Sequence, residues 1–548
     1  MSRGGVKNVL GNNIRELRQT RGLNQEDVAK ALGISSPTYS SWERGRTEPS
    51  IDGLLSLARY FDVSVDRLLR SESRILKIGS WLEPPERFHP IKEQSGIFAM
   101  IYRMVFNHLY YYDIFERRFH VELVDSWLVN RSSDEPGYTF YVRSNVKFHN
   151  GDPLQLEDIK SSYELFRDQF PILKQFIDSV EIRREEHAIE LRLRKWIELE
   201  YIPSPYIIPR SCVERAECFE GTGPFMLVDE EQRDKVRGGL KQPVMLERNN
   251  EYYGKMAAIE AVEVQRFNSL ERMKASLENG NIDFAYSFEL RNSEKSGDFV
   301  VKHGHSTHPF YLVLKPESKI CSDRNVRMAV DCAIDRNRIL ERIGVEEAEL
   351  LPSSHLYLLL REEPSEDEGS RYDQAKARES WEAAKDSLNQ KGITDFVLKI
   401  CPAHNDPVLA EIANEIVEQL KETGISAEEI KLLDDDREGN KRKIKEADAL
   451  VEIVKFSTLI ALYENLHSSR SPFRNWSYND SLIDDSLDDI KGMDTFRTIQ
   501  ESLSSTRFFL PLFHRGIVVT HTKDLDMRSR LRLTNVPYGP DMVHWEFK

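Results

Sequence analysis

Long hydrophobic runs are missing from this sequence of 548 residues, although 40% of its residues are hydrophobic. The two best candidates, 97–106 and 508–513, are short or interrupted by Arg103, whereas a membrane-spanning helix needs about 18 apolar residues in succession. The first ten residues also lack the apolar core of a secretion signal. We therefore predict a cytoplasmic protein that does not contact a membrane.

Cysteine is scarce as well: the chain has five, at irregular spacing, which is typical of reduced, buried thiols in the cytosol. Cys212 and Cys218 have no second pair with which to hold a structural zinc ion. The segment His303-Gly-His-Ser-Thr-His308 fits no standard metal spacing, and we interpret it as a polar loop. The sequence contains no nucleophile elbow and no Walker loop. We expect no metal, no cofactor and no enzymatic activity.

Charge is distributed unevenly along the chain. The net charge is -15, and residues 1–72 hold 11 Lys and Arg against 9 Asp and Glu, a net charge of +2. Residues 73–548 therefore carry -17, the difference between these two values. Only the N-terminal segment does not repel a polyanion such as DNA. At roughly 150 residues per domain, the length predicts three or four structural units.

The N-terminal segment has a helical pattern. Between residues 8 and 70, apolar residues recur every three or four positions and alternate with capping and turn residues. This pattern predicts five short helices, at about 9–21, 25–32, 36–45, 51–61 and 65–69. Asn24, Ser50 and either Ser35 or Ser36 are placed to cap helices, and Gly33 is suited to a left-handed helix end.

Residues 25–50 resemble the helix-turn-helix of the Cro/CI (XRE) repressor family. The small Ala29 allows the two helices to cross closely, and Gly33 forms the turn between them. In this geometry the second helix enters the major groove by its N-terminal end. The resemblance implies base contacts from Ser36, Pro37, Thr38, Ser40 and Ser41, and phosphate contacts from Gln25, Arg44 and Arg46.

The partner that this resemblance implies is double-stranded DNA, bound as an inverted-repeat operator by a homodimer. The alternative is a helical bundle that binds another protein, with Arg44 and Arg46 simply exposed to solvent.

After residue 73 the pattern changes to mixed strands and helices, such as 75–79, 138–143, 157–167 and 408–422. Several motifs in this part resemble family 5 of the solute-binding proteins, which serve oligopeptides, dipeptides and nickel. They are Leu123-Val-Asp-Ser-Trp, the segment 138–153, Gly221-Thr-Gly-Pro-Phe, the segment 246–253, Gly280-Asn-Ile-Asp and the segment 325–336.

The expected fold class is therefore multidomain: an all-α five-helix helix-turn-helix domain, then a two-lobed α/β periplasmic-binding-protein-like (class II) body with an extra subdomain. We place the helical domain at 1–72 and the body at 73–548. The first lobe takes about 74–303 plus 508–548, and the second takes about 304–507. The motifs at 149–152 and 221–225 are interpreted as structural turns rather than ligand contacts.

Ligands bind α/β sheets beyond the carboxyl ends of strands, and aromatic residues at such ends are our candidate ligand contacts. They are Trp81, Tyr110, Tyr111, Tyr311 and Phe456, each of which is also consistent with core packing. The resemblance implies an aspartate in the second lobe for the α-ammonium group of a peptide, but residues 454–459 have no acid there. This favours an anionic or neutral solute, with Lys455 as its partner. The ligand class stays open among a peptide, a sugar or sugar phosphate, and a metal complex.

Together these features predict a cytosolic DNA-binding transcriptional regulator whose body senses a small-molecule ligand. The alternative is a cytosolic solute receptor whose helical domain mediates protein contacts rather than DNA binding.

Overall fold

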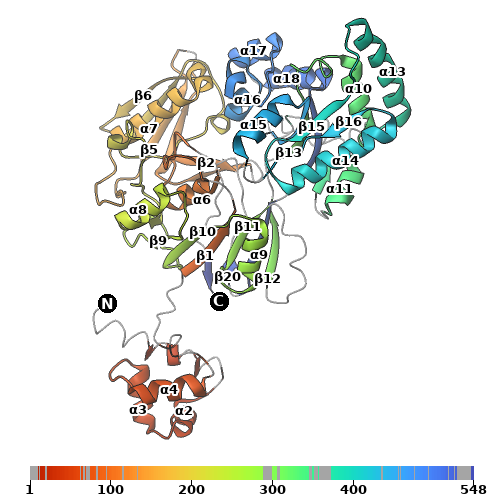
Figure 1. The fold of residues 1–548 in the computed structure, drawn as a ribbon. Coiled ribbons are helices and arrows are strands. Elements are labelled where there is room, and N and C mark those ends of the chain that lie inside the picture. Colours follow the sequence, from red (N-terminus) through yellow and green to blue (C-terminus); the bar gives the residue numbers. More distant parts are fainter. Residues whose placement is uncertain are drawn as a thin grey trace.

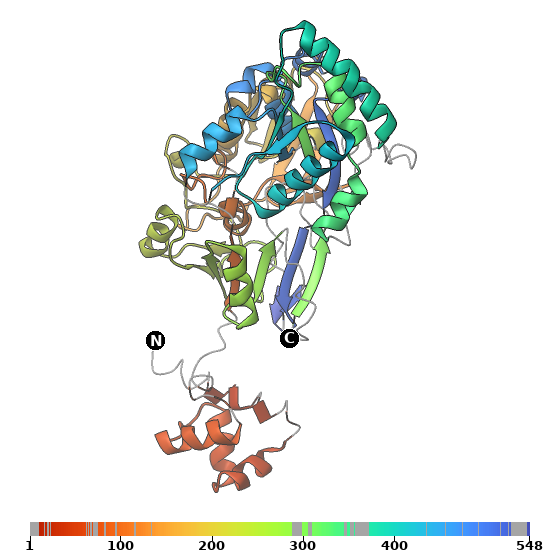
Figure 2. The ribbon, with the colours of Figure 1, turned by 45° about the vertical axis from the view of Figure 1, so that its right-hand side comes forward.

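The structure, a computed structural model, describes residues 10–68, 75–287, 299–304, 309–344, 348–350, 356, 372–527 and 545–547, apart from single positions and stretches of up to three residues inside these ranges. A small helical head precedes a body that is built on three larger sheets (Figures 1 and 2). The expected fold class, a helical domain followed by a two-lobed α/β body, is confirmed.

The helices of the head begin at the predicted caps. They are α2 (Gln25–Ala31), α3 (Ser36–Glu43) and α4 (Ile51–Tyr60), and the described residues between Leu10 and Arg18 are also helical. Asn24, Ser35 and Ser50 each accept a hydrogen bond from a first-turn backbone N–H. Gly33 has φ +66°, the left-handed conformation predicted for it. Most of the predicted fifth helix lies outside the described residues.

The core of the head is made by one face of each helix. Val28, Tyr39 and Leu57 are fully buried, and Ala29 is 2% exposed where α2 crosses α3. A methyl group on Gly11 would lie 2.6 Å from the carbonyl oxygen of Glu43. Because glycine has no such group, the first helix and the end of α3 can approach closely. The head therefore has a hydrophobic core of its own.

The first sheet of the body has seven strands and is mixed. In spatial order they are β12 (Phe299–Gly304), β19 (Ile517–Thr522), β11 (Phe284–Ser287), β1 (Ile75–Ser80), β10 (Ala261–Arg266), β9 (Val244–Arg248) and β8 (Phe225–Met226). Helix α9 (Leu270–Glu278) packs against β1 and β11, and α8 (Glu230–Arg237) packs against β9.

A four-stranded antiparallel sheet forms the extra subdomain. Its order is β4 (Val124–Asn130), β5 (Gly137–Val142), β7 (Ala188–Leu193) and β6 (Ile177–Arg183). Helix α7 (Leu156–Gln169) packs on β6 and β7, and the hairpin of β2 (Tyr110–Asp113) and β3 (Arg118–Val121) follows α6 (Gly96–Val105).

The six-stranded sheet belongs to the second lobe. Its order is β14 (Ala348–Leu350), β18 (Phe509–Arg515), β13 (Pro309–Leu314), β17 (Ala449–Ile453), β15 (Leu398–Pro402) and β16 (Ala427–Glu429). Alternate residues of β13 enter different clusters: Leu312 packs toward α10 (Arg324–Ala333), α13 (Gln374–Gln390) and α14 (Pro407–Thr423). Tyr311 faces the other cluster, with α16 (Leu459–Leu466), α17 (Ser481–Asp488) and α18 (Met493–Thr506). Both faces of this sheet are therefore covered, as its continuous apolar strands require.

Two adjacent antiparallel connections join the large sheets. The chain leaves the seven-stranded sheet at β12 and enters the six-stranded sheet at β13, and it returns from β18 to β19. Gly304 pairs with Ile517 on one side of this crossing, and Pro309 pairs with His514 on the other. We predicted that the chain re-enters the first lobe at about residue 508. In the structure it re-enters that lobe after β18, because β18 pairs with β13 in the second lobe. Of the predicted polar loop 303–308, His303 and Gly304 are the last two residues of β12, and residues 305–308 lie outside the described part.

The glycines of the 221–225 motif allow a close backbone contact with α6. A methyl group on Gly221 would lie 1.9 Å from the carbonyl oxygen of Val105, and the backbone N–H of Gly223 donates to the same oxygen at 2.8 Å. His149, from the 149–152 motif, contacts the carbonyl oxygen of Gly223 through Nε2 at 3.0 Å. These contacts support the interpretation of both motifs as structural turns.

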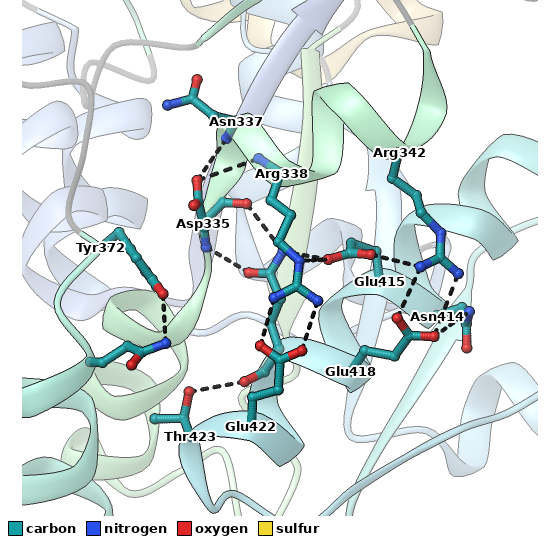
Figure 3. A network of polar contacts seen from close by, with 12 residues as sticks. Asp335, Asn337, Arg338, Arg342, Tyr372, Asn414, Glu415, Glu418, Glu422 and Thr423 are labelled. Carbon is teal, nitrogen blue, oxygen red and sulfur yellow. Dashed lines mark hydrogen bonds and ion pairs between the residues drawn. The ribbon is translucent and has the colours of Figure 1, made fainter.

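The end of the 325–336 motif starts the next helix, α11 (Arg336–Ile343), which Asp335 caps. On the outer face, Arg338 and Arg342 of α11 pair with three glutamates of α14 (Figure 3). Glu415 is buried between the two guanidinium groups, 2.8 Å from Arg338 Nε and 3.0 Å from Arg342 Nη1. The motif thus positions α11 so that its arginines pair with the glutamates of α14, a helix that lies far from α11 in the sequence.

Candidate DNA interface and ligand site

Helix α3 presents one polar face to solvent. This face holds Ser36, Pro37, Ser40, Ser41 and Arg44, which follow one another at alternating intervals of one and three residues. Tyr39, Trp42 and Glu43 point into the core instead. Pro37 and Arg44 are exposed, and Ser36, Ser40 and Ser41 are half-buried. The predicted base contacts thus lie on the accessible side of α3.

Local hydrogen bonds already involve some of these side chains. The Thr38 hydroxyl lies 2.7 Å from that of Ser35, the cap of α3, and Thr47 donates to Ser41 at 2.8 Å. The side-chain hydroxyls of Ser36 and Ser40 have no hydrogen-bond partner within the described part of the chain. Arg46 follows Gly45 and is exposed.

The buried carboxylate of Glu43, at the end of α3, contacts the first helix of the head and α2. The side chain of Glu43 is 1% exposed, with Arg18 Nε 2.6 Å from Oε1 and Gln25 Nε2 2.6 Å from Oε2. Burial raises the pKa of Glu43, but the hydrogen bonds from Arg18 and Gln25 and the charge of Arg18 outweigh it and leave the pKa lowered. Gln25, our predicted phosphate contact, therefore uses its amide nitrogen to hold the end of α3.

In the body, the topology defines where a ligand would lie. Strands β1, β10 and β11 are parallel and end at the edge where β12 leaves the first large sheet. Strands β15 and β17 are parallel and end at the edge where β13 enters the second. The carboxyl ends of both sets of strands thus lie beside the crossing, the position at which α/β sheets bind ligands.

The second lobe carries an ion pair at this edge. Glu452 is near the end of β17 with its side chain 10% exposed, and its Oε1 lies 3.2 Å from Nε2 of His404, which follows β15. The amide of Asn475 donates to the other carboxylate oxygen at 3.4 Å. The hydrogen bond and charge of Glu452 raise the pKa of His404. Sequence reasoning missed both residues, although His404 lies four residues before the predicted helix at 408–422.

Trp81 lies at the corresponding edge of the first lobe, directly after β1. Its ring is half-buried against the apolar cluster of Met273, Leu277, Ile282 and Ala285. Its Nε1 is buried and has no hydrogen-bond partner in the described part of the chain. This indole N–H can donate a hydrogen bond to a ligand.

Tyr110 and Tyr111 point to opposite sides of β2. Tyr110 is 1% exposed, stacks on Phe140 and donates its hydroxyl to the carbonyl oxygen of Ile202 at 2.6 Å, so that it belongs to the core. Tyr111 is half-buried between the ring of His120, at 4.6 Å, and the guanidinium group of Arg103, at 4.6 Å.

Tyr311 and Phe456 are both buried, and their rings meet edge to face at 5.5 Å. Tyr311 also lies directly opposite Glu452 in the register of β13 and β17. These aromatic residues therefore form the floor beneath the ion pair. Lys455 lies outside the described residues.

Within the described part of the chain, every helix is too short or too polar to span a bilayer. The described residues also contain no group of three or more His, Cys, Asp or Glu side chains that could hold a metal ion.

The fold and the two sites thus define two classes of domain. The head is of a DNA-binding type, and the body that follows it in the chain is of a solute-binding type. The family described as bacterial extracellular solute-binding proteins, family 5, matches residues 118–454, more than half of the chain, and a helix-turn-helix family matches residues 14–68. The chain belongs to family 5 of the bacterial extracellular solute-binding proteins, and its N-terminal domain is an XRE-type helix-turn-helix. Neither family is an enzyme family.

Each part of the chain has its own relatives. The head is 52% identical over 56 residues to the HTH-type transcriptional regulator DdrOP3 of Deinococcus deserti, covering 10% of this chain and 43% of that protein. The body is 25% identical over 325 residues to a putative ABC transporter peptide-binding protein of Brucella ovis, covering 54% of this chain and 57% of that protein. The chain spans about half the length of these curated relatives.

The solved structure of NikZ from Campylobacter jejuni, in complex with Ni(L-His), has the same fold as the body. It superposes with a TM-score of 0.71 at 18% identity, over 86% of this chain and 99% of that chain.

Proposed function

We propose that the protein is a cytosolic DNA-binding transcriptional regulator whose two-lobed body senses a small-molecule ligand. The observation that carries the proposal is the exposed polar face of α3 on the same polypeptide as a solute-binding fold. In this proposal residues 1–72 are the DNA-binding head, residues 73–548 are the sensor, and two heads bind an inverted repeat as a homodimer.

The proposed ligand site combines Trp81 of the first lobe with Glu452 and His404 of the second. A ligand that touches both lobes favours their closed arrangement by its differential affinity, which gives the body a way to change the head. Glu452 also changes the ligand class that we favour. A carboxylate at this edge suits a ligand with N–H donors, such as an amine or a peptide, better than the anionic solute inferred for Lys455.

DNA binding is tested by titrating the full chain with genomic fragments in a gel shift. We expect a sequence-preferring complex that weakens steeply as salt rises, because phosphate contacts release counterions. Arg44→Ala should weaken binding to all sequences and reduce the slope of log affinity against log salt by about 1. The control is Arg59→Ala, an equal loss of charge at an exposed position of α4. A head that binds proteins would show no such sequence preference.

Ligand binding is tested by thermal-shift screening of the full chain against peptides, amines, sugars, sugar phosphates and nickel. A ligand at 100 times its dissociation constant should add about 2.7 kcal/mol to the stability of the body. Glu452→Gln should remove the response to a cationic ligand, whereas Glu382→Gln, exposed on α13, should leave it unchanged. No response to any class would contradict the sensing proposal.

A further inference from the structure

One edge of the four-stranded sheet is strand β4, which carries exposed apolar side chains. Within the described part of the chain, β4 pairs with β5 alone. Along β4, Leu128 is 59% exposed and Val129 is 47% exposed, two of the large hydrophobic side chains most open to solvent in the body. An open strand edge with exposed apolar side chains is a template for pairing with another strand.

The charges beside this edge are complementary to themselves. Asp125 and Arg131 each have a side chain that is 65% exposed, and they lie three residues on either side of Leu128. If β4 pairs antiparallel with β4 of a second copy about a two-fold axis through Leu128, each Asp125, at the β-bulge near the start of β4, comes near the partner's Arg131, the residue that follows β4. The same register places each Trp127 opposite the partner's Val129. An interface of this kind is isologous, since each contact occurs twice.

The present partners of these charges leave room for the pairing. Arg131 contacts Glu198 at 3.1 Å and lies 4.9 Å from the ring centre of Trp196, and Asp125 is 3.5 Å from Arg143. Each contact is at the surface, where an ion pair contributes little to stability. Opposite charges placed directly across two strands favour the pair, and like charges oppose it.

We propose that two copies of the chain dimerise by antiparallel pairing of their β4 strands, which joins the two four-stranded sheets into one of eight strands. The inference rests on the proposed function in one respect, since an inverted repeat requires two heads. The β4 pairing is independent of DNA, and it leaves the face of α3 untouched.

The test is sedimentation of the full chain without DNA, between 1 and about 100 times the concentration needed for detection. We expect wild-type protein to form a dimer of twice its 63.7 kDa mass. Leu128→Lys places two ammonium groups opposite each other at the axis and should raise the dimer dissociation constant at least about tenfold. The matched control is Leu482→Lys, at a position of α17 that is 51% exposed, which should leave the dimer unchanged.

Charge reversal gives a second, independent measurement. Asp125→Arg alone and Arg131→Asp alone should each weaken the dimer about tenfold, because each places like charges opposite one another. Their combination should restore dimerisation to within about threefold of wild type, because the pairs are re-formed with the signs exchanged. A wild-type chain that stays single at every concentration, a dimer insensitive to Leu128→Lys, or a double variant that does not recover would overturn the proposal.

A parallel titration with DNA separates this inference from the proposed function. The DNA is a genomic fragment selected by the wild-type chain. The Leu128→Lys variant should still bind one half-site of this fragment, but it should lose the additional affinity that the full inverted repeat gives. A β4-dependent dimer that does not bind DNA would contradict the proposed regulator function and support the β4 interface. A chain that binds DNA, but whose oligomeric state does not depend on β4, would support the regulator function and contradict the β4 interface.

Discussion

Replacing Glu43 by alanine should unfold the head and abolish DNA binding while the body stays folded. The change leaves Arg18, whose side chain is 13% exposed, without its carboxylate partner, and it removes the acceptor of the Gln25 amide. Breaking a buried ion pair from one side costs about 3–5 kcal/mol, comparable with the total stability of a small domain. The measurement is a calorimetric scan of the full chain, in which the head transition should disappear, together with a gel shift.

Two comparisons give this prediction its control. Glu43→Gln keeps the side-chain volume and one acceptor oxygen, so it should lose less stability than Glu43→Ala. Glu26→Ala, at an exposed position of α2, should change little. A head that melts normally in the alanine variant would show that the Arg18 contact contributes nothing.

The same contact makes the head sensitive to acid. Because the folded pKa of Glu43 is lower than its unfolded value, its contribution to stability is complete above the unfolded pKa, about 4.3. This contribution is lost as the pH falls through the folded pKa. We therefore expect Glu43→Gln to remove part of the acid dependence of head unfolding between about pH 5 and pH 3.

Replacing Asp331 by alanine should destabilise the second lobe by about 3–5 kcal/mol. Asp331 lies on α10 with 0% exposure, accepts from Arg336 Nη2 at 2.7 Å and pairs through its other oxygen with Arg507. Arg336 in turn donates to the carbonyl oxygen of Pro511. Arg507 has φ +54°, an uncommon conformation in the turn between α18 and β18 that this ion pair helps to hold. In the alanine variant, the guanidinium groups of Arg336 and Arg507 lose the carboxylate that they share.

The effect should appear in the lowest unfolding transition of the body, measured by calorimetry. DNA binding below that temperature should be unchanged, because the head has a separate core. Asp386→Ala, exposed on α13, is the matched control. An unfolding transition of the second lobe at the wild-type temperature would show that the buried charges are satisfied without Asp331.

The head was predictable almost residue by residue. The caps Asn24 and Ser50, the left-handed Gly33 and the small Ala29 at the helix crossing all follow from patterns that act within one or two helical turns. The order of motifs in the body also identified its family before any contact was known. Local signals of this kind depend on a few neighbouring residues, which the sequence displays directly.

The ligand candidates were less predictable. The prediction placed Tyr110, Tyr311 and Phe456 just past the ends of strands, but Tyr110 begins β2 and Tyr311 lies inside β13, and only Phe456 follows a strand. The structure buries all three against other aromatic rings. Their burial depends on which distant segments cover them, and no short-range pattern records that.

The sequence by itself determined the two families, the helix boundaries of the head and the residues on the exposed face of α3, because spacing and capping are local properties. Only the tertiary structure brought Glu452 to His404, buried Asp331 between Arg336 and Arg507, and left β4 at an open sheet edge. Each of these depends on strand order and on contacts between segments far apart in the chain. The physical reason is that burial and pairing are set by the whole fold, while helical periodicity is set by neighbours.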